Sequence, residues 1–180
     1  MRETFPVFVA AAVVLAGAAI APVFAAAADT TSTAAATDQS NRTIPNCTTI
    51  TEPGVYRLGG DLNGTAGTCI DVASDDVVLD GEGHTVAGDG SGVGIDVRAD
   101  DERAQDPAEN VTVRNVRVDS WETGVSFVNT RNATVENVTV EDAYTGIQVG
   151  DAAAARPGYP VSADGTTIRD STLADVKRGV

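Results

Sequence analysis

The sequence predicts an all-β protein, a right-handed parallel β-helix of about four coils of about 22 residues each, some carrying loop insertions. First, the segment NVTVRNVRV at 110–118 returns 22 residues later as NATVENVTV at 132–140. Second, β-branched residues inside each copy alternate with polar ones, and this period of two indicates half-buried strands. Third, aromatic residues make up only 4% of the chain, and stacked coils filled with Val and Ile need few of them. The period of two excludes a helical solenoid, and the regular return excludes a β-sandwich.

The chain begins with a segment typical of an export signal, which we place at residues 1–28. An apolar run extends from Phe5 to Ala28 and ends in small residues that supply an A-x-A-like cleavage site, with Pro22 a few residues ahead of them. The run is also long enough to span a bilayer, so an uncleaved signal anchor stays open as the alternative. No twin-arginine pair is present, so both readings predict Sec-type export to the cell surface or the medium.

A Thr/Ala/Ser-rich stretch at 29–43 has no apolar period and predicts a disordered linker, which leaves 44–180 as the β-helix domain. Export also bears on the two cysteines, Cys47 and Cys69, because disulfides persist outside the reducing cytosol. We therefore expect one disulfide that closes a loop of about 20 residues.

Each copy of the repeat predicts a strand, a tight corner, a second strand, a longer turn and a third strand led by glycine. Asn115 and Asn137 fall at the corner, where a left-handed backbone conformation is needed, and their side chains are expected to form a ladder. Two inserts, 98–109 and 151–164, are expected to be surface loops. Counting from the N-terminus, the copies contain the segments CIDV at 69–72, VVLDG at 77–81, NVTVRNVRV at 110–118, NATVENVTV at 132–140 and TTIRDSTL at 166–173.

The charge balance excludes several functions. The chain has 26 acidic and 12 basic residues, hence a net charge of −14, and no basic cluster that would bind nucleic acid. One histidine and two cysteines are too few for an ordinary zinc or iron–sulfur site, so we expect neither metal nor cofactor. Because salt screens charge repulsion, the carboxylate-rich, lysine-poor composition favours adaptation to concentrated salt over an acidic binding face.

The stretch from Cys47 through Pro53-Gly54-Val55-Tyr56 to Leu79-Asp80-Gly81-Glu82-Gly83-His84-Thr85-Val86 resembles NosD-type right-handed parallel β-helix proteins. With the repeats, the resemblance covers about residues 47–180. It implies a carbohydrate-binding or sugar-hydrolase β-helix exported to the surface, as is common in salt-loving archaea. The family also implies a copper-maturation accessory role, which stays a further alternative, although a lone His84 and two cysteines expected to be bonded to each other do not favour copper binding.

The sharpest candidate site is a strip on one turn of two neighbouring coils. Asp119 and Glu141 are 22 residues apart, which places them about one strand spacing, roughly 5 Å, from each other. Such carboxylate pairs serve glycoside hydrolysis, and Trp121 and Tyr144 nearby would stack on a sugar ring. A solvated acidic turn is the alternative. The remaining acidic candidates are Asp80, Glu82, Asp96, Glu122, Glu136 and Asp142.

His84 allows two interpretations. Beside Asp80 and Glu82 it would serve as a general acid or base. The alternative, which we favour, is that Gly81 and Gly83 form a turn and His84 fills a structural position in the coil.

Six N-x-[ST] sequons are present, and three of them arise from the repeat itself. Asn41 in the linker and Asn63 before a glycine-rich turn are the expected glycosylation sites.

The sequence ends at Val180, inside a strand and without a capping repeat. This predicts truncation of a longer β-helix or, alternatively, end-to-end pairing with another copy. We expect an exported carbohydrate-interacting or structural module whose partner is a polysaccharide or cell-surface glycan and whose only membrane contact is an uncleaved signal. A polysaccharide-cleaving enzyme, a hydrolase or a lyase, is the rival.

Overall fold

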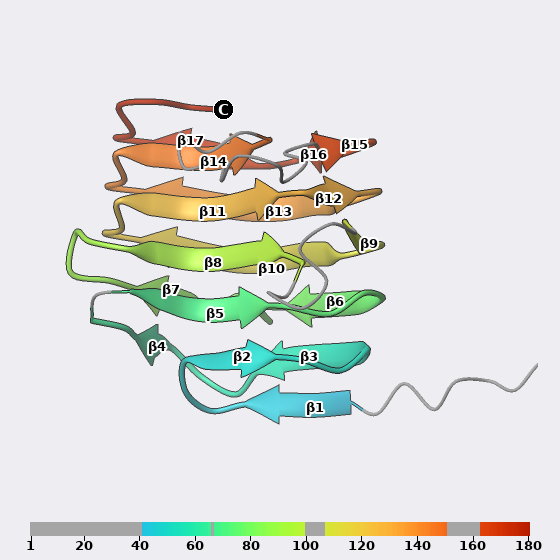
Figure 1. Cartoon of the computed structure of the whole chain (residues 1–180). Helices are drawn as coiled ribbons and strands as arrows, with labels where there is room; N and C mark the ends of the chain where they lie inside the picture. Colours follow the sequence, from blue (N-terminus) through green and yellow to red (C-terminus); the bar gives the residue numbers. More distant parts are fainter. Residues whose placement is uncertain (1–40, 66, 100–106, 151–162) are drawn as a thin grey trace, which may run out of the picture. The chain divides into compact units, whose positions relative to one another are not determined.

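The computed structural model describes residues 41–65, 67–99, 107–150 and 163–180, and within these ranges the chain is all-β, without helices (Figure 1). The expected export signal at 1–28 and the linker up to residue 40 lie outside the described residues. Within the described residues, no helix is long and apolar enough to cross a membrane.

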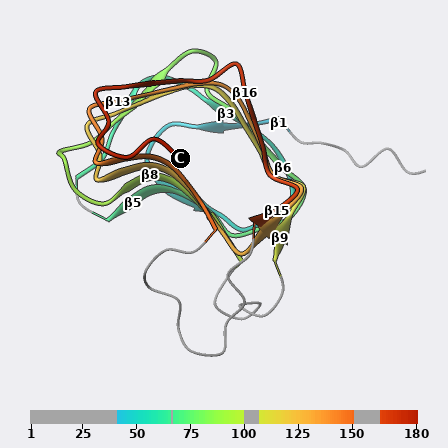
Figure 2. The same cartoon turned by 90° about the horizontal axis from the view of Figure 1, so that it is seen from above.

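The strands form three parallel sheets, and successive passes of the chain add strands to each sheet in turn (Figures 1 and 2). The first sheet contains β1 (Asn41–Ile44), β3 (Gly54–Leu58), β4 (Leu62–Asn63), β6 (Val77–Asp80), β7 (Thr85–Ala87), β10 (Thr112–Asp119), β13 (Thr134–Glu141), β16 (Thr167–Arg169) and β17 (Thr172–Ala174). The second contains β2 (Thr48–Ile50), β5 (Thr68–Val72), β8 (Val93–Arg98), β11 (Thr123–Val128) and β14 (Thr145–Val149). The third contains β9 (Ala108–Glu109), β12 (Thr130–Arg131) and β15 (Ala163–Asp164). This arrangement is compatible with the predicted parallel β-helix.

The register between strands follows the repeat offsets that the sequence predicts. Thr112 pairs with Thr134, 22 residues on, and Thr134 pairs with Thr167, 33 residues on. The Ile-Asp-Val segment of β5 also pairs with that of β8, through Ile70 and Ile95. Like side chains therefore stack on like, and the interior contains columns of buried aliphatic residues such as Ile70, Ile95, Val125 and Ile147.

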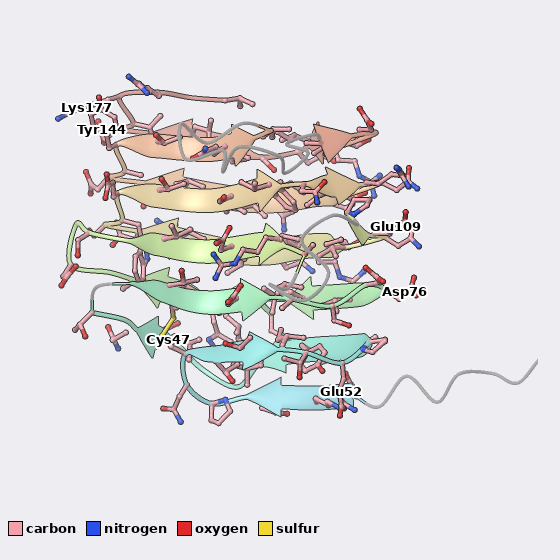
Figure 3. All side chains as sticks on the ribbon, viewed as in Figure 1. Cys47, Glu52, Asp76, Glu109, Tyr144 and Lys177 are labelled. Atoms are coloured by element: carbon pink, nitrogen blue, oxygen red, sulfur yellow. A yellow bond between two sulfur atoms is a disulfide. The ribbon has the colours of Figure 1, made fainter. Side chains whose placement is uncertain are left out.

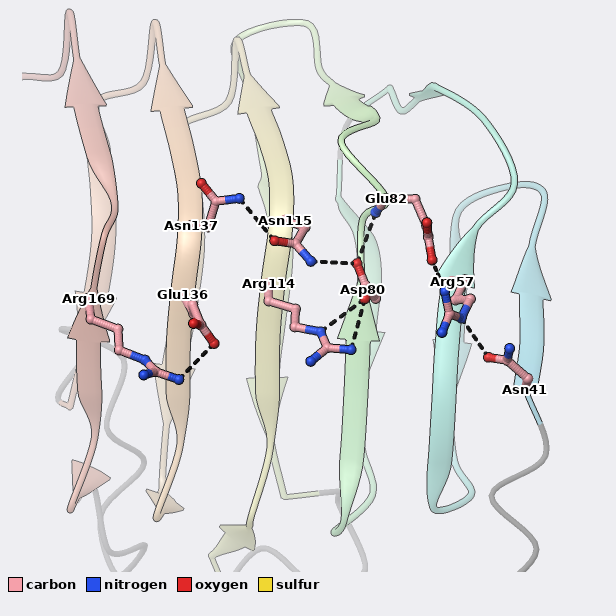
Figure 4. A network of polar contacts seen from close by, with 9 residues as sticks. All are labelled: Asn41, Arg57, Asp80, Glu82, Arg114, Asn115, Glu136, Asn137 and Arg169. Carbon is pink, nitrogen blue, oxygen red and sulfur yellow. Dashed lines mark hydrogen bonds and ion pairs between the residues drawn. The ribbon is translucent and has the colours of Figure 1, made fainter.

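The asparagine corners are confirmed, with one difference. Asn115 and Asn137 have φ of 52° and 51°, in the left-handed region that asparagine tolerates. They do not separate two strands, however, because β10 and β13 each continue through the corner as one bent strand. The Asn137 Nδ2 donates to Asn115 Oδ1 at 2.9 Å, which confirms the ladder (Figure 4).

The ladder ends on a buried carboxylate. Asn115 Nδ2 donates to Asp80 Oδ1 at 3.0 Å, and the Arg114 guanidinium contacts Asp80 Oδ2 at 2.9 Å (Figure 4). Burial alone raises the pKa of Asp80, but hydrogen bonds from Asn115 and the Glu82 N–H, together with Arg114, outweigh it and lower that pKa. The neighbouring pairs Arg57–Glu82 and Glu136–Arg169 likewise join successive coils.

The expected boundaries shift at three places. Strand β1 begins at Asn41, so the linker prediction is wrong for 41–43. This edge strand buries only Ile44, and its other residues are polar, so the sequence showed no apolar pattern there. The expected loop at 98–109 is shorter, because β8 includes Arg98 and β9 begins at Ala108. Strand β15 similarly occupies the end of the second insert. These two-residue strands are too short to show a periodicity.

Candidate functional site

A hollow of about 470 Å³ opens at the corner that leads from β10 and β13 into β11 and β14. It is lined by Glu122, Tyr144 and Lys177, which occupy equivalent places on successive coils, and Tyr144 and Lys177 are labelled in Figure 3. Two further carboxylates, Asp142 and Asp175, also line it, as does the buried Trp121. The hollow therefore combines three acidic side chains, two aromatic residues and one ammonium group.

The repeat itself builds this corner. Ser120, Asp142 and Asp175 are equivalent positions with φ of 59°, 49° and 53°, so each coil turns outward at the same point. Backbone hydrogen bonds hold the turns on one another: Tyr144 N–H donates to the Trp121 carbonyl at 3.3 Å, and Arg178 N–H donates to the Tyr144 carbonyl at 2.9 Å. The side chains that follow these corners are consequently fixed in a row.

Tyr144 is the exposed aromatic residue at this corner. It is 44% exposed, and its ring centroid lies 5.3 Å from Lys177 Nζ and 5.2 Å from Arg178 Cζ. Cation–π attraction at these distances holds the ring in place. The expected role of Tyr144, stacking on a sugar, is compatible with this exposure and stays a prediction.

Trp121 cannot have the role expected for it. The side chain is 1% exposed, and its Nε1 donates to the Val86 carbonyl at 3.0 Å, so the indole belongs to the core. Gly64 and Gly88 lie directly against it: a Cβ at either would approach the indole to 2.5 Å. The prediction that Trp121 stacks on sugar is therefore wrong, because the corner turns the indole inward to fill space that these glycines leave.

Asp119 and Glu141 are paired in register across β10 and β13, as their spacing predicts. Neither belongs to the wall of the hollow. The Glu141 carboxylate forms an ion pair with Arg117, and Asp119 accepts a hydrogen bond from Ser120 Oγ at 3.2 Å. Both carboxylates are therefore engaged by side chains of β10 or of the residue directly after it.

Another stacked carboxylate pair lies on the outward positions of the second sheet. Asp71 and Asp96 are neighbours in β5 and β8, and Arg98 contacts them at 3.0 and 3.5 Å. Asp96 is 7% exposed, and burial raises its pKa. The Asp71 Oδ1 is buried without a hydrogen-bond partner in the described part of the chain. The shared Ile-Asp-Val pattern was the sequence signal for this pair.

His84 occupies a structural place. Its N–H donates to the Gly81 carbonyl at 2.8 Å, which closes the turn expected there, and its Nδ1 lies 3.4 Å from Asp61 Oδ1. A hydrogen bond from the Thr85 N–H, followed by the contact with His84, lowers the pKa of Asp61. Among the described residues, no cluster of three or more histidine, cysteine or carboxylate side chains could hold a metal.

The two expected glycosylation sites have different surroundings in the structure. Asn41 lies in β1 rather than in a linker, and its Oδ1 accepts a hydrogen bond from Arg57 Nε at 2.8 Å (Figure 4). Asn63 is exposed at the end of β4. Glycosylation of either residue stays a prediction.

Sequence reasoning missed Asp175, Lys177 and Arg178 as residues of this corner. The signal was the 33-residue offset of the third copy, which aligns Asp175 with Asp142 and Lys177 with Tyr144.

The expected disulfide is present: Cys47 and Cys69 are bonded, and they tie the start of β2 to β5 (Figure 3).

No family model, curated protein or solved structure matches this chain.

Proposed function

We propose that this protein is an exported, right-handed parallel β-helix of the NosD type that binds carbohydrate at the cell surface or in the medium. The apolar segment at 1–28 and the Cys47–Cys69 disulfide support export, because disulfides persist in oxidising compartments. The acidic composition supports a role in concentrated salt.

The observation that carries the proposal is an exposed tyrosine beside a hollow lined by carboxylates. Sugars bind where an aromatic face covers their C–H groups and where acceptors take their hydroxyl protons. Tyr144 offers the first and Glu122, Asp142 and Asp175 offer the second, all on adjacent turns. The stacked backbone fixes the turns, so a ligand would find these groups already in position.

A glycan array in molar salt tests the proposal. We expect the protein to retain a subset of glycans, Tyr144→Ala to lose them, and Tyr144→Phe, the matched control, to keep them because the ring stays. Unchanged binding by Tyr144→Ala, or no binding by the wild type, would overturn it.

A polysaccharide-cleaving activity is the rival, and the register pairing of Asp119 with Glu141 favours it. A reducing-sugar assay on the retained glycans separates the two. Product formation that is lost in Asp119→Asn would support the enzyme, and unchanged binding without product would support the binding module.

A further inference from the structure

We propose that the rim of the corner hollow contains an anion subsite, made by Lys177 and Arg178 beside Tyr144, for the carboxylate or sulfate group of an acidic sugar. This inference rests on the proposed carbohydrate binding and names its substrate class.

The first observation is the pairing of the cations. In the described ranges, seven arginines form ion pairs with carboxylates, and Lys177 and Arg178 are the two cations that form none. The seven pairs are Arg42–Glu52, Arg57–Glu82, Arg98–Asp71, Arg114–Asp80, Arg117–Glu141, Arg131–Glu109 and Arg169–Glu136. In a chain of net charge −14, two adjacent cations without carboxylate partners are a distinct local feature.

The second observation is the position of these cations. Lys177 lines the hollow, and both cations contact the same ring, which is itself 44% exposed. The isolated backbone bridge between Thr145 and Arg178 fixes the segment that carries them. The two cationic groups lie over the Tyr144 ring, so a sugar that contacts the exposed part of this ring would lie next to them.

The chemistry of the two groups fits an anionic substituent. A guanidinium binds a carboxylate or sulfate through two parallel hydrogen bonds, and an ammonium adds a point charge. A sugar that contacts Tyr144 would bring such a substituent to Lys177 and Arg178, and its hydroxyls would reach the carboxylates of Glu122 and Asp142 that line the same hollow. Acceptors and cationic donors close together suit a ligand that carries both hydroxyls and a negative charge.

The net charge of the protein does not prevent this. Long-range repulsion between the acidic surface and an acidic glycan is screened within about 3 Å at molar ionic strength. Contacts at hydrogen-bond distance are screened less, so the local cations decide the preference under those conditions.

Isothermal titration of the full chain in molar salt tests the subsite. The probes are oligogalacturonides, neutral oligogalactosides of the same length, and sulfated oligogalactosides. We expect the acidic probes to bind more tightly than the neutral one. Lys177→Gln combined with Arg178→Gln should weaken the acidic probes about tenfold or more beyond any change in the neutral probe, whose binding reports on the Tyr144 ring that both cations contact. The carboxylate and sulfate probes distinguish the two sources of negative charge.

Arg169→Gln is the matched control, because it removes a positive charge from the same coil at an arginine already paired with Glu136. Lys177→Arg, which keeps the charge, should keep the preference. The subsite is refuted if the wild type binds acidic and neutral probes equally, or if the double variant and Arg169→Gln weaken the acidic probes by the same factor. In that case the carbohydrate-binding proposal still stands, provided that the neutral probe binds and Tyr144→Ala abolishes its binding.

Discussion

Replacing Asp80 with asparagine tests how the coils of the first sheet are held together. Asp80 is 5% exposed and accepts hydrogen bonds from Asn115, from the Glu82 N–H and from Arg114. Asparagine has nearly the same shape and keeps one acceptor oxygen, so the substitution removes mainly the negative charge that faces Arg114.

The expected cost follows from those contacts. A hydrogen bond to a charged partner contributes about 1.5–3 kcal/mol, and Arg114 makes two contacts with Asp80 Oδ2, both at 2.9 Å. Because the Arg114 side chain is 37% exposed, water compensates part of the loss. We expect Asp80→Asn to lower the free energy of unfolding by about 2–3 kcal/mol at neutral pH.

The pH dependence has a definite sign. The pKa of Asp80 in the folded chain lies below its ordinary value of 3.8, so the carboxylate stabilises the fold fully above 3.8. That stabilisation is lost as the pH falls through the folded pKa. The difference between wild type and variant should therefore be largest at neutral pH and shrink in strong acid.

Urea unfolding followed by fluorescence measures the effect, since Trp121 is the only tryptophan and is buried. Glu136→Gln is the control: it breaks the equivalent pair with Arg169 two coils further on, where both side chains are partly exposed and the loss should be about 0–1 kcal/mol. Equal losses in Asp80→Asn and Glu136→Gln, or a loss for Asp80→Asn that persists unchanged in strong acid, would refute the reasoning.

Four further predictions follow from single features of the fold. Reducing the Cys47–Cys69 disulfide should lower the free energy of unfolding by about 3 kcal/mol, measured by denaturant titration with and without reductant. Trp121→Ala should cost about 3–5 kcal/mol without changing glycan affinity, because the indole is core; a selective loss of binding would contradict this. Asp96→Asn should raise the melting temperature at neutral pH, since burial raises the pKa of Asp96 and its charge is unfavourable there; the gain should shrink as the pH falls through that raised pKa and vanish below the ordinary value of 3.8. Mass spectrometry of protein exported from a glycosylating host should find glycan on Asn63, and an unmodified Asn63 beside a modified β13 ladder asparagine would contradict the assignment.

The candidate site was only partly predictable from the sequence. Spacing alone placed Asp119 beside Glu141 and brought Tyr144 to the same turn, because a repeat of fixed length returns equivalent residues to neighbouring strands. The spacing did not indicate which side chains point into the core and which point to solvent. Trp121 and Tyr144 both follow a left-handed corner, yet one is 1% and the other 44% exposed, since they occupy adjacent places in the turn and point oppositely.

The sequence by itself determined the all-β class, the inter-coil register, the left-handed asparagine corners and the disulfide. These depend on local alternation, on repeat length and on residues whose backbone preferences act within a few positions. Only the tertiary structure decided which charges pair, which carboxylates are buried, and that Lys177 and Arg178 contact the Tyr144 ring instead of a carboxylate. Pairing and burial depend on which side chain of the neighbouring coil lies in register with a given residue. Because insertions of different length separate the coils, that partner cannot be identified from a single copy of the repeat.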